Sequence, residues 1–129
     1  MKHLAKAPVV ARILLGLLFI IFAANFWLKF MPTPPAEPGS PAANFIGAMF
    51  GSGYLTVVKV LELTAGILLV SGFFVNLGLL LIGPVILNIA LYNVMLAQGN
   101  YGMTAVLGIL ALVALAGRKD LLKTITAMK

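Results

Sequence analysis

The sequence contains no cysteine and only one histidine, His3, and these two shortages exclude several classes of site. Without cysteine the chain cannot form a disulfide, a thiolate zinc site or an iron–sulfur cluster. One histidine cannot supply two axial haem ligands or a histidine-based zinc site. The chain therefore carries no intrinsic redox cofactor or metal site, and any electrons must reside on a bound molecule or on a partner protein.

Charged residues are also scarce, at 9% of the 129 residues, whereas hydrophobic residues make up 62%. Soluble globular proteins contain about 25% charged and about 45–50% apolar residues. The mean hydropathy is +1.12, and a soluble chain of this length cannot bury so much apolar surface. The composition therefore predicts a single-domain protein, residues 1–129, that lies in a lipid bilayer.

Four apolar stretches mark the predicted membrane spans, at about residues 9–30, 54–74, 77–98 and 103–117. A bilayer core about 30 Å thick needs roughly 20 helical residues. The first three stretches meet this length, and flanking residues can extend the fourth. Because short connections make successive helices neighbours, the sequence predicts an all-α membrane protein: an antiparallel bundle of four transmembrane helices.

The distribution of basic residues predicts that both termini lie in the cytoplasm. Lys2, Lys6 and Arg12 lie at one end of the chain, and residues 118–129 contain four more basic residues. Basic residues are enriched beside the cytoplasmic ends of membrane helices. The loop after the first span, by contrast, contains Glu37 and no Lys or Arg. No basic patch with interleaved aromatic residues is present, which argues against nucleic-acid binding.

A proline-rich loop and a short amphipathic stretch separate the first two spans. Residues 31–44 contain five prolines, which predicts an extended, non-helical chain across the outer surface. In residues 45–53 the bulky apolar side chains share one helical face: Phe45, Ile46, Met49 and Phe50. This pattern predicts a short interfacial helix before the second span.

Polar side chains from three spans lie at similar predicted depths in the outward half of the bundle. Lys59 and Glu62 are three residues apart and share a helical face, and Asn88 and Tyr92 are four apart. Asn25 occupies the same half on the first span. At about 1.5 Å per residue, Glu62 lies roughly 12 Å below the outer boundary, and a charge at the bilayer centre costs about 2.5–3.5 kcal/mol. We therefore predict an outward-facing ligand pocket lined by these five residues.

The same residues also have a purely structural explanation. Lys59 and Glu62 can form a buried ion pair that specifies helix packing, while Asn25 and Asn88 form interhelical hydrogen bonds. Gly66 lies one turn beyond Glu62 on the same stripe, which predicts a close approach by a neighbouring helix. Both explanations stay open at the level of the sequence.

The third and fourth spans contain few other polar residues. Pro84 removes one helical hydrogen bond and predicts a kink before Asn88. Asn93 lies about 140° around the helix from Asn88, so the two side chains cannot face the same cavity. Thr104 is the polar residue of the fourth span, which is therefore predicted to be structural.

Taken together, these motifs resemble the DoxX-like membrane proteins over nearly the whole length of the chain. Residues 12–19, RILLGLLF, are similar to that family's opening span, and a Gly-Tyr pair at residues 53–54 precedes the second span. Glu62 is followed by a glycine four residues later. Residues 84–89, PVILNI, are similar to the family's Pro-x-x-x-Asn-Ile pattern. Tyr92 and Asn93 stand where one branch of the family has a histidine.

The resemblance implies a multi-pass protein of the bacterial inner membrane. The family takes its name from a subunit of a thiosulfate:quinone oxidoreductase, and other members are linked to quinone or thiol-oxidant stress. The chain is accordingly expected to bind a quinone-like or other lipophilic molecule, or to support a soluble or membrane redox partner. In either role it would be at most an accessory subunit of a quinone-linked oxidoreductase.

Two other functions also fit the sequence. One is a small proton-coupled transporter that acts as a homodimer, as in the small multidrug exporters, which have four spans and an intramembrane glutamate. Their glutamate lies in the first span without a neighbouring lysine, and here Lys29 and Lys59 disfavour a cationic substrate. The other is a membrane scaffold, in which the polar cluster is satisfied entirely within the bundle.

Overall fold

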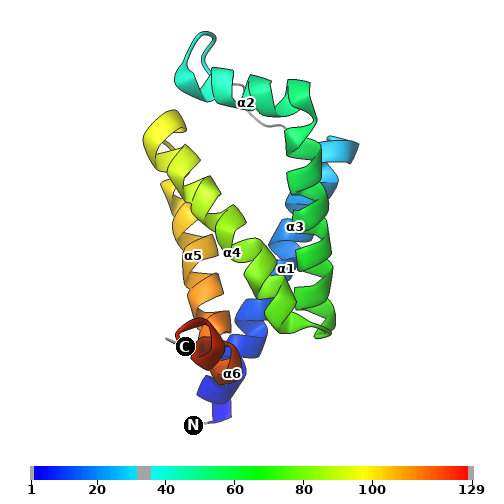
Figure 1. Cartoon of the computed structure of the whole chain (residues 1–129), viewed down its shortest axis with the longest axis vertical. Helices are drawn as coiled ribbons and strands as arrows, with labels where there is room; N and C mark the ends of the chain where they lie inside the picture. Colours follow the sequence, from blue (N-terminus) through cyan, green and yellow to red (C-terminus); the bar gives the residue numbers. More distant parts are fainter. Residues whose placement is uncertain (1, 32–35, 128–129) are drawn as a thin grey trace.

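The computed structural model describes residues 2–31 and 36–127, with side chains from residue 6 onward. All regular secondary structure in these ranges is helical (Figure 1). The helices are α1 (Lys2–Leu28), α2 (Pro41–Ser52), α3 (Tyr54–Ser71), α4 (Val75–Leu91), the π-helix η1 (Tyr92–Ala97), α5 (Tyr101–Ala116) and α6 (Lys119–Ile125).

Three helical segments are long and apolar enough to cross a membrane: Lys6–Leu28, Tyr54–Ser71 and Val75–Leu96. The helix α5, at Tyr101–Ala116, is apolar but shorter. The first two spans end earlier than predicted because the backbone leaves the helical region there: Lys29 has φ 54° and Gly72 has φ 84°. The all-helical fold with apolar helices is therefore confirmed.

Four helices form the body of the molecule. The helix α1 packs mainly on α3 and also on α5, while α4 packs on α3 and α5. Figure 1 shows α2 lying across one end of this body and α6 at the opposite end, beside both ends of the chain. We call these the α2 end and the terminal end. The helices α3 and α4 meet at the terminal end and diverge towards α2 (Figure 1).

The helices α1 and α3 approach closely at a pair of glycines. A Cβ atom on Gly66 would lie 2.8 Å from the carbonyl oxygen of Gly16, and one on Gly16 would lie 2.7 Å from that of Gly66. Leu15, Phe19 and Leu69 are fully buried in the adjoining core. The close approach predicted at Gly66 is therefore confirmed, and neither glycine has room for a side chain.

Side-chain hydrogen bonds connect α6 to the start of α4. The Nε of Arg118 donates to the Oδ1 of Asn76 at 2.7 Å, and the Nδ2 of Asn76 donates to the Oδ2 of Asp120 at 2.9 Å. The bond from Asn76 lowers the pKa of Asp120, and the nearby charge of Arg118 lowers it further. At the same end Pro8 of α1 lies against Gly117 at the end of α5, so the first part of α1 and the end of α5 adjoin each other.

The prediction that residues 31–44 form no helix is wrong for the last four of them. The helix α2 begins at Pro41, a residue type that suits the first turn because its missing N–H needs no partner there. The Oγ of Ser40 caps this turn by accepting a hydrogen bond from the backbone N–H of Ala43 at 3.1 Å. Residues 32–35 of the predicted extended loop lie outside the described residues.

The helix α4 continues into the π-helix η1, where the backbone N–H of Gln98 donates to the carbonyl of Asn93, five residues earlier. Asn93 is buried, and its Nδ2 donates to the Oγ1 of Thr104 on α5 at 2.8 Å. Asn88 lies on the exposed side of α4. The two asparagines thus face different sides, as their spacing predicts, and the hydrogen bond to Thr104 connects η1 with α5.

Candidate functional site

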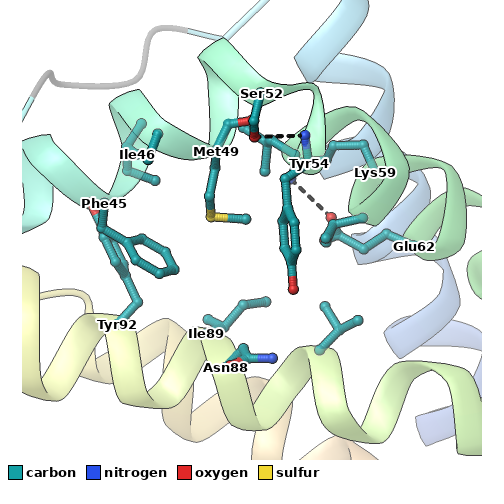
Figure 2. A pocket seen from close by; sticks show the side chains of 14 residues that line it. Phe45, Ile46, Met49, Ser52, Tyr54, Lys59, Glu62, Asn88, Ile89 and Tyr92 are labelled. Atoms are coloured by element: carbon teal, nitrogen blue, oxygen red, sulfur yellow. Dashed lines mark hydrogen bonds and ion pairs between the residues drawn. The ribbon is translucent and has the colours of Figure 1, made fainter.

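A cavity of about 480 Å³ lies between α2, α3 and the part of α4 and η1 nearest to α2 (Figure 2). Much of its wall is apolar, from Phe45, Ile46 and Met49 of α2, Leu55 and Val58 of α3, and Val85 and Ile89 of α4. Its polar lining residues are Ser52, Tyr54, Lys59, Glu62, Asn88 and Tyr92. An apolar chamber with a few polar groups is typical of sites for small organic ligands.

The structure brings Lys59, Glu62, Asn88 and Tyr92 to this one cavity, whereas the fifth predicted site residue, Asn25, does not line it. The Oδ1 of Asn25 instead accepts a hydrogen bond at 2.7 Å from the backbone N–H of Met31. This N–H lies beyond the last turn of α1, so it has no partner within that helix. Asn25 is therefore engaged at the end of α1. Ligand binding by the other four residues stays a prediction.

Lys59 and Glu62 form an ion pair on the α3 wall. The Nζ of Lys59 lies 3.2 Å from the Oε2 of Glu62. Glu62 is only 2% exposed, whereas the side chain of Lys59 is 20% exposed. A carboxylate removed from water needs a compensating charge or hydrogen bond, which Lys59 provides. The ion pair of the structural explanation is therefore present, whereas the interhelical hydrogen bonds that it expected from Asn25 and Asn88 are not found among the described residues. The side chain of Lys59 also lines the cavity.

Asn88 lies on the α4 wall, across the cavity from Lys59 and Glu62 (Figure 2). Its side chain is exposed and makes no hydrogen bond to another residue within 2–31 or 36–127. A carboxamide offers two donor hydrogens and an acceptor oxygen, and leaving them unpaired in an apolar medium is unfavourable. Asn88 therefore has its full hydrogen-bonding capacity available to a molecule in the cavity.

Aromatic contacts hold α2 in place as the third wall. The rings of Phe45 on α2 and Tyr92 on η1 have centroids 5.7 Å apart, and those of Phe50 on α2 and Phe26 on α1 stack at 5.6 Å. Gly53, with φ 83°, connects α2 directly to α3 in a conformation that favours glycine. The helix α2 is thus attached to η1, α1 and α3.

Sequence reasoning did not assign the α2 residues or Tyr54 to the site. Figure 2 shows Tyr54 extending from the start of α3 towards the α4 wall, while Met49 and Ile46 descend from α2. The apolar face of residues 45–53 was a usable signal, because an interfacial helix directs such a face towards the spans. No comparable signal distinguishes Tyr54 from an ordinary aromatic residue at the membrane interface.

The polar groups that line the cavity include both hydrogen-bond donors and hydrogen-bond acceptors. Lys59, Asn88 and Tyr92 can donate hydrogen bonds, and Glu62 and Asn88 can accept them. In the described residues, no group of three or more histidine, aspartate and glutamate side chains could hold a metal ion. The site can therefore hold a carbonyl or hydroxyl group of a molecule whose remaining surface is apolar.

Comparisons of the chain with protein-family models, with curated proteins and with solved structures found no match. The resemblance to DoxX-like proteins therefore stays a prediction that rests on the motifs alone. What the structure adds is a cavity in which the predicted polar residues of α3 and α4 meet an apolar wall from α2.

Proposed function

We propose that this chain is a DoxX-like protein of the bacterial inner membrane. In this proposal it binds a quinone-like or other small lipophilic molecule and serves as an accessory subunit of a redox-linked assembly. The observation that carries the proposal is the cavity between α2, α3 and α4, which combines apolar walls with the amide of Asn88, a group that has no hydrogen-bond partner among the described residues. Its volume of about 480 Å³ lies within the range of about 300–1,000 Å³ typical of ligand pockets.

A quinone suits the arrangement of donors in the cavity. Its ring carries two opposite carbonyl oxygens, and Lys59 and Asn88 stand on facing walls as donors. On reduction the same oxygens become hydroxyl groups, which can donate to the Oδ1 of Asn88 or to Glu62. One set of side chains can thus hold both redox forms. The electrons themselves must come from a partner protein, because the sequence provides no intrinsic redox group.

We further propose that the terminal end lies in the cytoplasm and that α2 lies at the outer surface. Basic residues at the terminal end, including Lys6, Arg118 and Lys123, support this orientation. Since the chain has no cysteine, Glu37→Cys and Thr126→Cys give single-thiol proteins directly. A membrane-impermeant thiol reagent should label Glu37→Cys in intact cells and Thr126→Cys only after permeabilisation, and the reverse pattern would invert the topology.

Ligand retention tests the proposed function directly. The wild type, Glu62→Gln, Asn88→Leu and a control, Thr64→Ala, would be purified in mild detergent and their bound small molecules identified by mass spectrometry. Thr64 lies two residues from Glu62, but its hydroxyl donates to the backbone of its own helix and it does not line the cavity. We expect a quinone or related lipophile in the wild type and the control, and its loss from Asn88→Leu and Glu62→Gln.

A membrane scaffold is the second candidate, and the Lys59–Glu62 pair favours it because each partner satisfies the other. The amide of Asn88, which has no partner within residues 2–31 and 36–127, argues against a fully satisfied polar cluster. The same purification separates the two functions. If no lipophile is bound and a protein partner is retained equally by all four proteins, the ligand-binding proposal fails and the scaffold replaces it.

A further inference from the structure

The helices α3 and α4 pack closely only near the terminal end. The buried residues of α4 all lie in its first half: Val75, Gly78, Leu79 and Ile82. Those of α3 are Glu62 at its middle and Ala65, Gly66 and Leu69 in its second half, and a Cβ atom on Gly78 of α4 would lie 3.2 Å from the side chain of Leu69. Because the chain turns between these halves at residues 72–74, the two buried halves adjoin each other. The remaining halves diverge towards α2 (Figure 1).

The cavity occupies this divergence and has three walls. They come from α2, α3 and the α4–η1 segment, and among the described residues none from α1 or α5 lines it. Exposed apolar side chains flank the cavity walls on both diverging helices, with Val57 of α3 at 61% and Leu87 of α4 at 62% exposure. Both helical segments have the length and hydropathy of membrane spans, so in a bilayer the side without a wall would face the lipid tails.

The helix α2 covers the cavity at the end where water would reach it (Figure 2). Two contacts attach α2 to the other walls. The rings of Phe45 and Tyr92 join it to η1, and the backbone N–H of Tyr54 at the start of α3 donates a hydrogen bond to the Oγ of Ser52 at 3.2 Å. The groups that can hold a polar head, Lys59 and Asn88, lie beneath α2 on the diverging helices. A molecule dissolved in the bilayer reaches them sideways, whereas one dissolved in water must pass α2.

We propose that the ligand is an amphipathic molecule that enters sideways between α3 and α4 from the membrane leaflet nearest to α2. Its polar head binds between Lys59 and Asn88, and its apolar chain leaves through the unwalled side and stays among the lipid tails. This inference rests on the proposed function, because it assigns the ligand class and the route for the same cavity. A head group that lacks a chain is accordingly a poor ligand, since it is scarce in the bilayer.

The route can be measured without any ligand. Nitroxide labels would be attached to three single-cysteine variants in nanodiscs: Val85→Cys on the cavity wall, Leu87→Cys on the exposed face of α4 and Thr126→Cys at the terminal end. The measured quantity is how often each label collides with oxygen and with a water-soluble nickel chelate. Oxygen concentrates in the bilayer and the chelate in water. We expect Val85→Cys to match Leu87→Cys. A match with Thr126→Cys, or shielding from both reagents, would overturn lateral entry.

The ligand class is tested with two probes that share one head: a dimethoxy-methyl-benzoquinone with a decyl chain and the same benzoquinone without it. Each is added at equal total concentration to nanodiscs containing wild type or Asn88→Leu, and the retained quinone is measured by mass spectrometry. We expect at least a tenfold larger difference between the two proteins for the probe with the chain. Equal retention of both probes would overturn the lipid-resident ligand while leaving the proposed function intact. Retention of neither would overturn both proposals, whatever the nitroxide labels report.

Discussion

The two ends of the bundle differ in how closely their helices pack. On the terminal side of the cavity, α1 and α3 are in backbone contact at Gly16 and Gly66, and the fully buried Leu69 adjoins them. At the α2 end, α3 and α4 have separated, and Asn88 has no partner among the described residues. The difference teaches that α3 and α4 can pack closely at one end and still separate around a cavity at the other.

The helix α3 takes part in both ends, and Glu62 marks the change between them. Towards the terminal end its stripe continues through small residues, Ala65 and Gly66, that admit α1. In the other direction the same face carries Lys59 and the cavity wall. Substitutions along α3 and α4 should therefore separate effects on stability from effects on binding.

The largest expected effect comes from filling the glycine contact. Gly66→Leu places a side chain where even a Cβ meets the Gly16 carbonyl and Ile20, and overpacking of this kind costs about 3 kcal/mol of unfolding free energy. Gly108→Leu is the matched control, because a Cβ there meets no atom within 4 Å. Reversible unfolding in bicelles measures both. Equal losses at the two positions would show that the terminal end is not the stabilising one.

Removing the partner of Glu62 should have the next largest effect. Lys59→Met leaves the carboxylate of Glu62 buried without a compensating charge and should lower the unfolding free energy by about 2 kcal/mol. This is less than the roughly 3–5 kcal/mol expected for a fully buried pair, because Lys59 is partly exposed. The double variant Lys59→Met/Glu62→Gln should regain most of this loss. If the double variant is instead less stable than Lys59→Met alone, the pair is not the reason for the cost.

The two asparagines of the third span provide a matched pair with opposite expected outcomes. Asn93→Leu breaks the buried hydrogen bond to Thr104 and should lower the unfolding free energy by about 1 kcal/mol, the scale of interhelical hydrogen bonds in membranes. Asn88→Leu removes an unpaired amide, so we expect unchanged or higher stability together with loss of the ligand. A destabilised Asn88→Leu would mean that its amide contributes to packing.

The smallest expected effect is the dependence of stability on pH at the terminal end. The hydrogen bond from Asn76 lowers the pKa of Asp120 in the folded state. The charged carboxylate therefore stabilises the folded state above the ordinary aspartate pKa, and this stabilisation disappears as the pH falls through the lowered pKa of the folded state. Wild type should therefore lose more thermal stability than Asp120→Asn between about pH 6 and about pH 3. Glu37→Gln serves as the control, and parallel curves for wild type and Asp120→Asn would contradict the prediction.

Features that depend on local helix geometry could be predicted from the sequence. The ion pair of Lys59 and Glu62, the separation of Asn88 from Asn93, and the close approach at Gly66 all follow from residue spacing along single helices. Each requires only that the segment be a helix with one side packed. The all-helical fold and the approximate positions of the four apolar helices followed from hydropathy for the same reason, although most of the predicted limits differ from the observed ones by one to three residues.

Features that depend on the path of the chain between helices could not be predicted. The hydrogen bond of Asn25 to Met31 exists because the chain turns sharply at Lys29, which periodicity within α1 does not reveal. The role of α2 as a cavity wall likewise depends on where Phe45 meets Tyr92, residues that are distant in sequence. The open divergence of α3 and α4 is a property of the assembled bundle rather than of either helix.

The π-helix η1 makes one point of the third span tolerant of a change in chain length. Hydrogen bonds there run from residue i+5 to residue i, as from Gln98 to Asn93, so loss of one residue from 92–97 restores ordinary helical bonding. Loss of a residue from the preceding α4 instead rotates every later side chain by about 100° and moves Asn88 off the cavity wall. We expect chains related to this one to gain or lose single residues at η1 before they do so elsewhere in the span, which an alignment of such chains would reveal.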